Sequence, residues 1–264
     1  MDIYNDDCFN IFPNIPEKSI NLFLLDLPYA NKKFGNCTAC SWDTPIDLDK
    51  MWVEIKRMMK PNGIIIFFCN TKFGYALINS NLKWFKYDLI APRFVEQKIW
   101  EKSKKVGFLS ANKQPLRKHE NIYIFKKEQG TYNPQKTEGD PYIDNRDTKR
   151  NEEIVYGKNI IRKQKENKGD RHPTSILPEF YNEEAETTIL KYNSVHKTIH
   201  RTQKPVDLLE WLIKTYTNEE DLVMDFCMGS GSCGMACKNT NRKFIGIEKD
   251  EEIFKLAEKR LKSN

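Results

Sequence analysis

Four consecutive residues, Asp26-Leu27-Pro28-Tyr29, carry the groups needed to activate an amino group on a planar ring. Such an amine is a poor nucleophile because its lone pair is delocalised into the ring. Acceptors that pull on its two protons push the nitrogen towards tetrahedral geometry. The Asp26 carboxylate offers one acceptor, and the Leu27 carbonyl, held by the fixed φ of Pro28, offers the other. Tyr29 offers a ring for stacking on an extruded base. Taken alone, a turn with a helix-capping Asp26 explains the motif equally well.

A second group of residues has the features of a nucleotide-binding turn. The segment Gly229-Ser230-Gly231 follows an apolar run that ends in Asp225-Phe226. Glycines at such a place let the backbone turn tightly and approach a ligand closely. Glu248 follows at the tip of the next apolar run, where an acid in a doubly wound sheet takes ribose hydroxyls.

The spacing of the glycines leaves the nucleotide open. Gly229, Gly231 and Gly234 match the G-x-G-x-x-G pattern of a dinucleotide site. Asp225-Phe226 favours S-adenosylmethionine instead, because carboxylates and aromatic faces stabilise its sulfonium cation. Methyl transfer from that donor to an amine needs positioning, with no metal and no covalent enzyme intermediate. An ordinary strand-to-helix turn with a surface Glu248 is the alternative.

Both motifs follow apolar runs that are typical of buried strands, and helical patterns lie between these runs. Alternation of this kind predicts an α/β fold with a mainly parallel, doubly wound sheet. The expected strands are residues 20–26, 64–69, 98–100, 122–125, 222–225 and 243–248. The expected helices are residues 49–60, 73–78, a helix opened by Pro205, one starting near Ser232, and residues 251–261.

Residues 127–196 differ from the rest of the chain, since they are polar and apolar runs are rare. A stretch of this length is too long for an ordinary loop. We therefore expect three parts: a catalytic half at 1–126, an inserted recognition region at 127–196, and a cofactor-binding half at 197–264. The insertion is either a folded module or a segment that orders on its partner.

Composition limits the surroundings in which the protein works. The net charge of +6 is modest, but residues 98–127 hold far more Lys and Arg than Asp and Glu. That excess suits phosphate contacts, although a solvated face explains it too. No apolar run is long enough for a bilayer and no secretory signal is visible, so we expect a cytoplasmic protein. Scattered cysteines indicate reduced thiols, and Cys37 and Cys40 lack the second pair of a zinc site.

The ordered motifs resemble those of the permuted, β-class DNA amino-methyltransferases. Residues 26–29 resemble the family's D-P-P-Y motif, with Leu27 in place of the first proline. Residues 226–231 resemble its F-x-G-x-G motif, and residues 200–205 its H-P-T-Q-K-P segment. Asp7-Cys8 resembles its early G-D-C segment.

The resemblance implies a Rossmann-like methyltransferase sheet, S-adenosylmethionine, double-stranded DNA and base flipping. An initial Asp in the catalytic motif favours N6 of adenine; N4 of cytosine and an inactive DNA-binding relative are the alternatives. The catalytic residues are then Asp26, Leu27, Pro28 and Tyr29. The expected cofactor-binding residues are Asp7, Cys8, Asp26, Thr202, Gln203, Lys204, Asp225, Phe226, Gly229, Ser230, Gly231 and Glu248.

The resemblance leaves the assembly open. Homodimers are common in the family, so the protein is a possible homodimer. A restriction nuclease is a second possible partner. Methyltransferases of RNA or protein are further alternatives, and residues 127–196 are expected to determine the recognition sequence.

Overall fold

The computed structural model describes residues 1–30, 44–81, 95–106, 117–144, 165–172, 189–192 and 203–263. Its main sheet contains β1 (Asp2–Asn5), β2 (Ile20–Leu25), β3 (Met59–Cys69), β4 (Val95–Val106), β5 (Arg117–Lys126), β10 (Ile189–Tyr192), β11 (Leu222–Asp225) and β12 (Lys243–Glu248). Its helices are α1 (Cys8–Ile11), α2 (Leu48–Met58), α3 (Thr71–Ser80), α4 (Val206–Tyr216), α5 (Ser232–Asn239) and α6 (Glu251–Lys262), and a 3-10 turn, η1, covers Phe12–Asn14.

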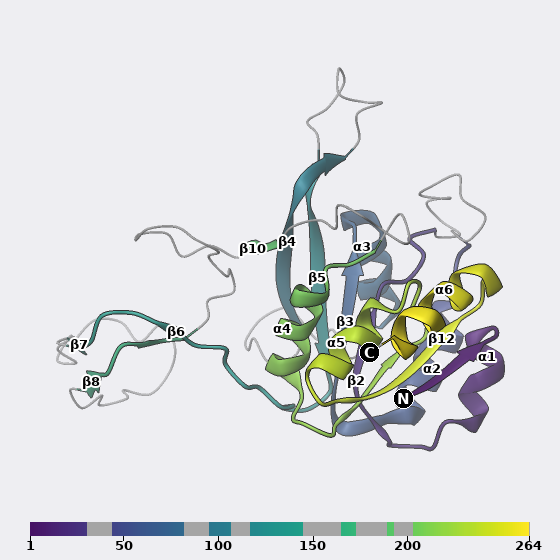
Figure 1. Ribbon diagram of the computed structural model, residues 1–264, viewed down its shortest axis with the longest axis horizontal. Coiled ribbons are helices and arrows are strands. Elements are labelled where there is room, and N and C mark those ends of the chain that lie inside the picture. The colour runs from purple at the N-terminus through teal and green to yellow at the C-terminus, as the bar shows by residue number, and fades with distance from the viewer. Residues whose placement is uncertain are drawn as a thin grey trace. The chain divides into compact units, whose positions relative to one another are not determined.

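The eight strands lie in the order β1-β12-β11-β2-β3-β5-β4-β10 (Figure 1). Every neighbouring pair is parallel except those of β5, which runs antiparallel to both β3 and β4. The predicted α/β class with a mainly parallel sheet is confirmed. The reversed β5 and the edge strand β1 were not predicted.

Strand β2 shows why the sheet is covered on both faces. Phe23 and Leu25 join one buried cluster with Met51 and Trp52 of α2. Leu22 and Leu24 point to the opposite face and join a second cluster with residues of α4, α5 and α6. An uninterrupted apolar run is therefore what a central strand between two helical layers requires. Figure 1 shows the helices distributed on the two sides of the sheet.

Helix α2 begins where the sequence predicts but ends earlier. The Asp47 carboxylate caps it by accepting a hydrogen bond of 3.1 Å from the Lys50 N–H. We expected Pro61-Asn62-Gly63 to end the helix, but it already ends at Met58 and that segment belongs to β3. Met59 pairs with Ile20 of β2, and the register shifts between Ile20 and Leu22. Backbone pairing with β2 thus replaces the last helical turn.

The polar middle of the chain contains a compact unit of its own, Pro134–Pro173. Two small antiparallel sheets form it: β6 (Thr137–Glu138) with β9 (Asp170–Arg171), and β7 (Tyr142–Asp144) with β8 (Lys165–Asn167). The Arg171 guanidinium lies 4.8 Å from the centre of the Tyr142 ring and donates a 2.9 Å hydrogen bond to Asn167. Strand β10, further along the chain, pairs with β4 of the main sheet.

Among the residues described, no helix is both long and apolar enough to span a bilayer.

Candidate active site

The carboxyl ends of neighbouring strands bring the two predicted motifs to one edge of the sheet. Strands β2 and β11 are parallel, with Val223 opposite Leu22 and Met224 opposite Phe23. Asp26 directly follows β2, and Asp225 ends β11. Strand β12 continues the same arrangement on the other side of β11 and ends at Glu248. Ligands of open α/β sheets bind outside such strand ends, so the topology itself selects this edge.

Asp26 contacts Tyr29 and Lys204. Its Oδ1 accepts a hydrogen bond of 3.0 Å from the Tyr29 hydroxyl. Its Oδ2 contacts the Lys204 ammonium in an ion pair. The Asp26 side chain is 25% exposed, whereas that of Lys204 is only 9% exposed. The carboxylate therefore keeps access to the exterior, while its counter-ion lies inside the fold.

Tyr29 lies flat against a second aromatic ring. Its ring is stacked on Phe73 of α3, with centroids 5.5 Å apart and an interplanar angle of 25°. Phe73 is buried, and the Asn70 side chain caps its helix by accepting from the Phe73 N–H at 2.8 Å. Leu27 is also buried, which ties the loop after β2 to the core.

The glycine-rich loop is shaped by Glu248. The Gly229 N–H donates to Glu248 Oε2 at 2.9 Å, and Glu248 Oε1 accepts from the Asp250 N–H at 2.9 Å. Gly229 has φ of +51°, and nothing within 4 Å would contact a side chain built there. The loop therefore presents bare backbone to open space, as a ligand-binding turn requires. Gly231, with φ of +75°, and the buried Ser230 complete the turn into α5.

Asp225 is a buried carboxyl among other acids. Burial, together with the charges of Asp26 and Glu248, raises its pKa to about 8, although the Cys227 N–H bond and Lys204 oppose the shift. Its Oδ1 accepts that Cys227 bond at 3.1 Å. A carboxyl with this pKa takes up or releases a proton near neutrality, and a cation beside it favours the ionised form.

Phe226 anchors the start of the glycine-rich loop in the hydrophobic core. Its ring is buried and packs edge-on against Phe12 at 5.2 Å and Phe23 at 6.3 Å. Phe226 therefore packs in the core, and its role beside a ligand stays a prediction.

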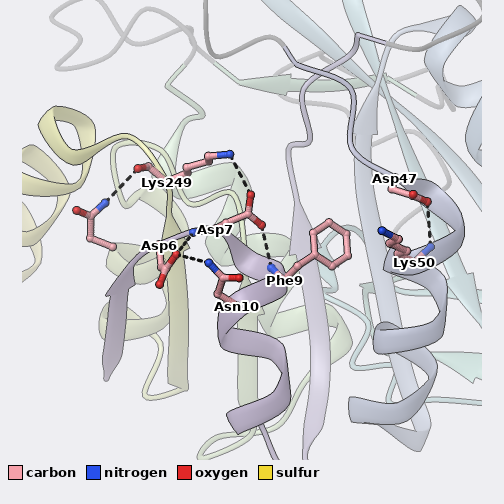
Figure 2. A pocket seen from close by; sticks show the side chains of 8 residues that line it. Asp6, Asp7, Phe9, Asn10, Asp47, Lys50 and Lys249 are labelled. Atoms are coloured by element: carbon pink, nitrogen blue, oxygen red, sulfur yellow. Dashed lines mark hydrogen bonds and ion pairs between the residues drawn. The ribbon is translucent and has the colours of Figure 1, made fainter.

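A pocket of about 760 Å³ lies beside the start of the chain (Figure 2). The Lys249 ammonium, next to Glu248, bonds to Asp7 at 3.0 Å, and Asp7 caps α1 through the Phe9 N–H at 3.0 Å. The pocket is lined by Asn5, Asp6, Asp7, Phe9, Asn10, Asp47, Lys50 and Lys249. Burial and then the charge of Asp7 raise the pKa of Cys8 to about 12, so its thiol stays protonated.

These contacts bring together most of the residues that sequence predicts. Asp26, Lys204 and Asp225 interact directly or through their charges, as do Gly229 and Glu248. Asp7 joins the neighbouring pocket. Gln203 is described just before Lys204, whereas Thr202 lies outside the described residues, as do Cys37 and Cys40. No group of residues suited to holding a metal ion occurs in the described part of the chain.

Comparison with known proteins decides the family. Residues 20–259 match the family N6_N4_Mtase, described as DNA methylase. The chain belongs to this family of DNA methylases.

Relatives of this methylase are distant but extend over nearly the whole chain. The type II methyltransferase M.HpaI of Haemophilus parainfluenzae is 27% identical over 95% of this chain and 70% of its own length. A solved complex of M1.HpyAVI with S-adenosylmethionine is 24% identical, has a TM-score of 0.61, and covers 98% of this chain and 99% of that one. The cytosine-N4-specific PvuII DNA methyltransferase is 15% identical with a TM-score of 0.64, over 99% of this chain and 86% of that one. At these identities the solved structures show the shared fold.

Several residues around the methylase site were not predicted. Phe68 contacts the Lys204 ammonium and Phe73 stacks on Tyr29. In the sequence both look like core residues, because nothing in an apolar run distinguishes a ring that contacts a site residue from one that only packs in the core. Lys249 and Lys50 enter the pocket from elements far apart in the chain. Only the position of Lys249 directly after Glu248 was a usable signal.

Proposed function

We propose that this DNA methylase transfers a methyl group from S-adenosylmethionine to N6 of an adenine flipped out of double-stranded DNA, at a specific sequence. The observation that carries the proposal is the pairing of strand ends. Asp26, which can accept a proton of an amine, lies near Asp225 and the glycine loop, which can hold a cationic methyl donor. The D-P-P-Y-like motif and the order of motifs along the chain support assignment to the permuted β class.

The residues present fit S-adenosylmethionine. Gly229 leaves room for close approach of a ligand to backbone, and Glu248 at a strand tip suits ribose hydroxyls. Asp225 and Phe226 supply a carboxyl and a ring beside that loop. Asp7 lines the neighbouring pocket, and the family resemblance implies that Asp7 and Cys8 contact the donor's adenine. When bound, the donor supplies a methyl group on a positively charged sulfur.

The chain's own residues then prepare the amine. Asp26 and the Leu27 carbonyl accept the two N–H protons, so that the nitrogen lone pair turns towards the methyl carbon. A bound donor would supply the methyl group while its sulfur kept the electrons of the C–S bond, and Asp26 would pass the extra proton from the nitrogen to water. Tyr29, supported from behind by Phe73, stacks on the base and keeps the attack in line.

The remaining parts of the chain suggest how a target is chosen. The compact unit at Pro134–Pro173 lies inside the 127–196 segment for which we propose target recognition. The type II names of relatives support membership of a restriction-modification pair with a nuclease. We propose further that the protein is cytoplasmic and forms a homodimer.

The test is methyl transfer followed by identification of the product. Wild-type protein and tritiated S-adenosylmethionine are incubated with mixed-sequence duplex DNA and competing RNA, and the labelled nucleosides are then identified by mass spectrometry. We expect N6-methyladenine in one sequence context. N4-methylcytosine alone would assign the cytosine alternative, and label in RNA in preference to DNA would refute the proposal.

A further inference from the structure

The ammonium of Lys204 is buried in the candidate active site. Only 9% of its side chain is exposed, although lysines are rarely buried without a strong partner. Its contacts within the described residues include the Asp26 carboxylate and the face of the Phe68 ring, whose centre lies 5.0 Å from Nζ. Both contacts favour the charged ammonium over the neutral amine.

The position of Lys204 is set by rigid neighbours. Pro205 follows it and fixes the start of α4, where the Pro205 carbonyl accepts from the Leu209 N–H at 3.3 Å. Leu208 and Leu212 then bury one face of α4 in the core. The ammonium is thereby fixed relative to Asp26, which directly follows β2, and to Phe68 of β3.

Among the residues that the structure describes, two further acids share the charged group around Asp26. Asp225 at the end of β11 and Glu248 at the end of β12 interact electrostatically with one another, and Asp26 and Lys204 both act on Asp225. The Cys227 thiol, which also faces these acids, is kept neutral because burial raises its pKa well above the usual value. Tyr29 contributes a neutral hydroxyl. Lys204 thus offsets the mutual repulsion of acids in this group.

We propose that Lys204 is a positioning residue for methyl transfer: it holds Asp26 ionised and correctly oriented, rather than serving chiefly as a contact of the cofactor. This inference rests on the proposed function, because it assumes that Asp26 must accept a proton of the target amine. A protonated Asp26 would present a donor on one oxygen and lose its use as an acceptor there. Lys204 prevents this in a site whose other charges favour protonation.

The test compares K204M and K204R with wild type at saturating S-adenosylmethionine and DNA between pH 6 and 9. We expect K204M to lose roughly 10- to 100-fold in kcat, with a larger deficit at pH 6 than at pH 8.5. K204R keeps a fixed charge and should recover most of kcat and the wild-type pH profile. The dissociation constant for S-adenosylmethionine, measured by calorimetry, should change by less than about 3-fold.

Lys214→Met is the matched control, because Lys214 lies on the same helix α4 and pairs with Glu210 at the surface. It should leave kcat and the pH profile unchanged. If K204M weakened cofactor binding but kept wild-type kcat at saturation, Lys204 would be a cofactor contact and the inference would be overturned. A pH-independent loss that K204R does not recover would overturn it as well.

A folding failure is also informative. Removing one partner of a buried ion pair is destabilising, whereas removing both is often nearly neutral. If K204M lacks a thermal unfolding transition, the double variant D26N/K204M should regain it, and absence of that recovery contradicts a role through Asp26. Failure of the proposed function is distinguishable, since wild type itself would then transfer no methyl group to DNA adenine.

Discussion

At the scale of single residues, Asp225 has the most unusual chemistry of the site. It is buried, and its pKa is raised to about 8 by burial and by the neighbouring acids. A neutral carboxyl has little attraction for a cation, so Asp225 attracts a cationic ligand fully only after it has lost its proton. A cationic methyl donor beside it would release the proton.

This linkage predicts that affinity for S-adenosylmethionine depends on pH. Below pH 8 Asp225 is mostly protonated, so binding of the sulfonium must expel a proton and weakens as pH falls. We expect affinity to increase between pH 6 and pH 8 by at most about tenfold per pH unit. Calorimetry in buffers of different ionisation enthalpy should detect the released proton. D225N, which cannot titrate, should bind weakly with no such dependence; an unchanged dependence in D225N would contradict the assignment.

At the scale of elements, strand β12 and the glycine loop depend on each other. Met228, in the loop, donates its N–H to the Ile247 carbonyl at 3.0 Å. A side chain at Gly246 would contact the Met228 sulfur and would approach Phe244 Cε1 to 2.6 Å. The strand thus requires a glycine where the loop lies over it.

G246A is therefore expected to displace the loop. The cost should be roughly 1–3 kcal/mol of unfolding free energy, as for other overpacked sites, with weaker binding of S-adenosylmethionine. Thermal unfolding and calorimetry measure the two effects. K243A, at the exposed start of the same strand, is the control and should change neither. A G246A protein with wild-type stability would show that the packing of this strand is looser than described.

The elements also show what a sequence can predict. The apolar runs of β2 and β11 and the striped helix α4 are local patterns, and each was predicted close to its observed bounds. The direction of β5 depends on pairing with β3 and β4, which no local pattern encodes. Strand β1 is short and mostly exposed, so it lacks the apolar signal of a central strand. The pairing of Lys204 with Asp26 joins residues 178 positions apart and follows only from the fold.

At the scale of the whole molecule, the chain divides into a sheet-based body and the small unit Pro134–Pro173. Arg171 holds that unit together, since it contacts Tyr142, Asn167 and the backbone of Asp140. The unit belongs to the segment for which we propose target recognition, whereas the residues that we propose for cofactor binding belong to the body.

R171A should therefore separate recognition from cofactor binding. We expect DNA affinity at the target sequence to fall roughly tenfold or more, because loss of the guanidinium loosens the unit, while S-adenosylmethionine binding stays within about twofold. Fluorescence anisotropy with target and scrambled duplexes, at fixed salt, measures the first quantity. R171K, which keeps the charge but not the planar contacts, should be intermediate. If R171A bound the target DNA with wild-type affinity and specificity, the unit Pro134–Pro173 would not be the part of the chain that recognises the target sequence.

The whole account depends on Asp26 acting on the target amine, and a single-turnover measurement tests this most directly. The rate of methyl transfer is followed with D26A and wild type, both saturated with S-adenosylmethionine and target DNA, so that binding differences do not enter. We predict a fall in the rate constant of roughly 100-fold or more for D26A, with the protein still folded. A D26A rate equal to that of wild type would contradict the mechanism.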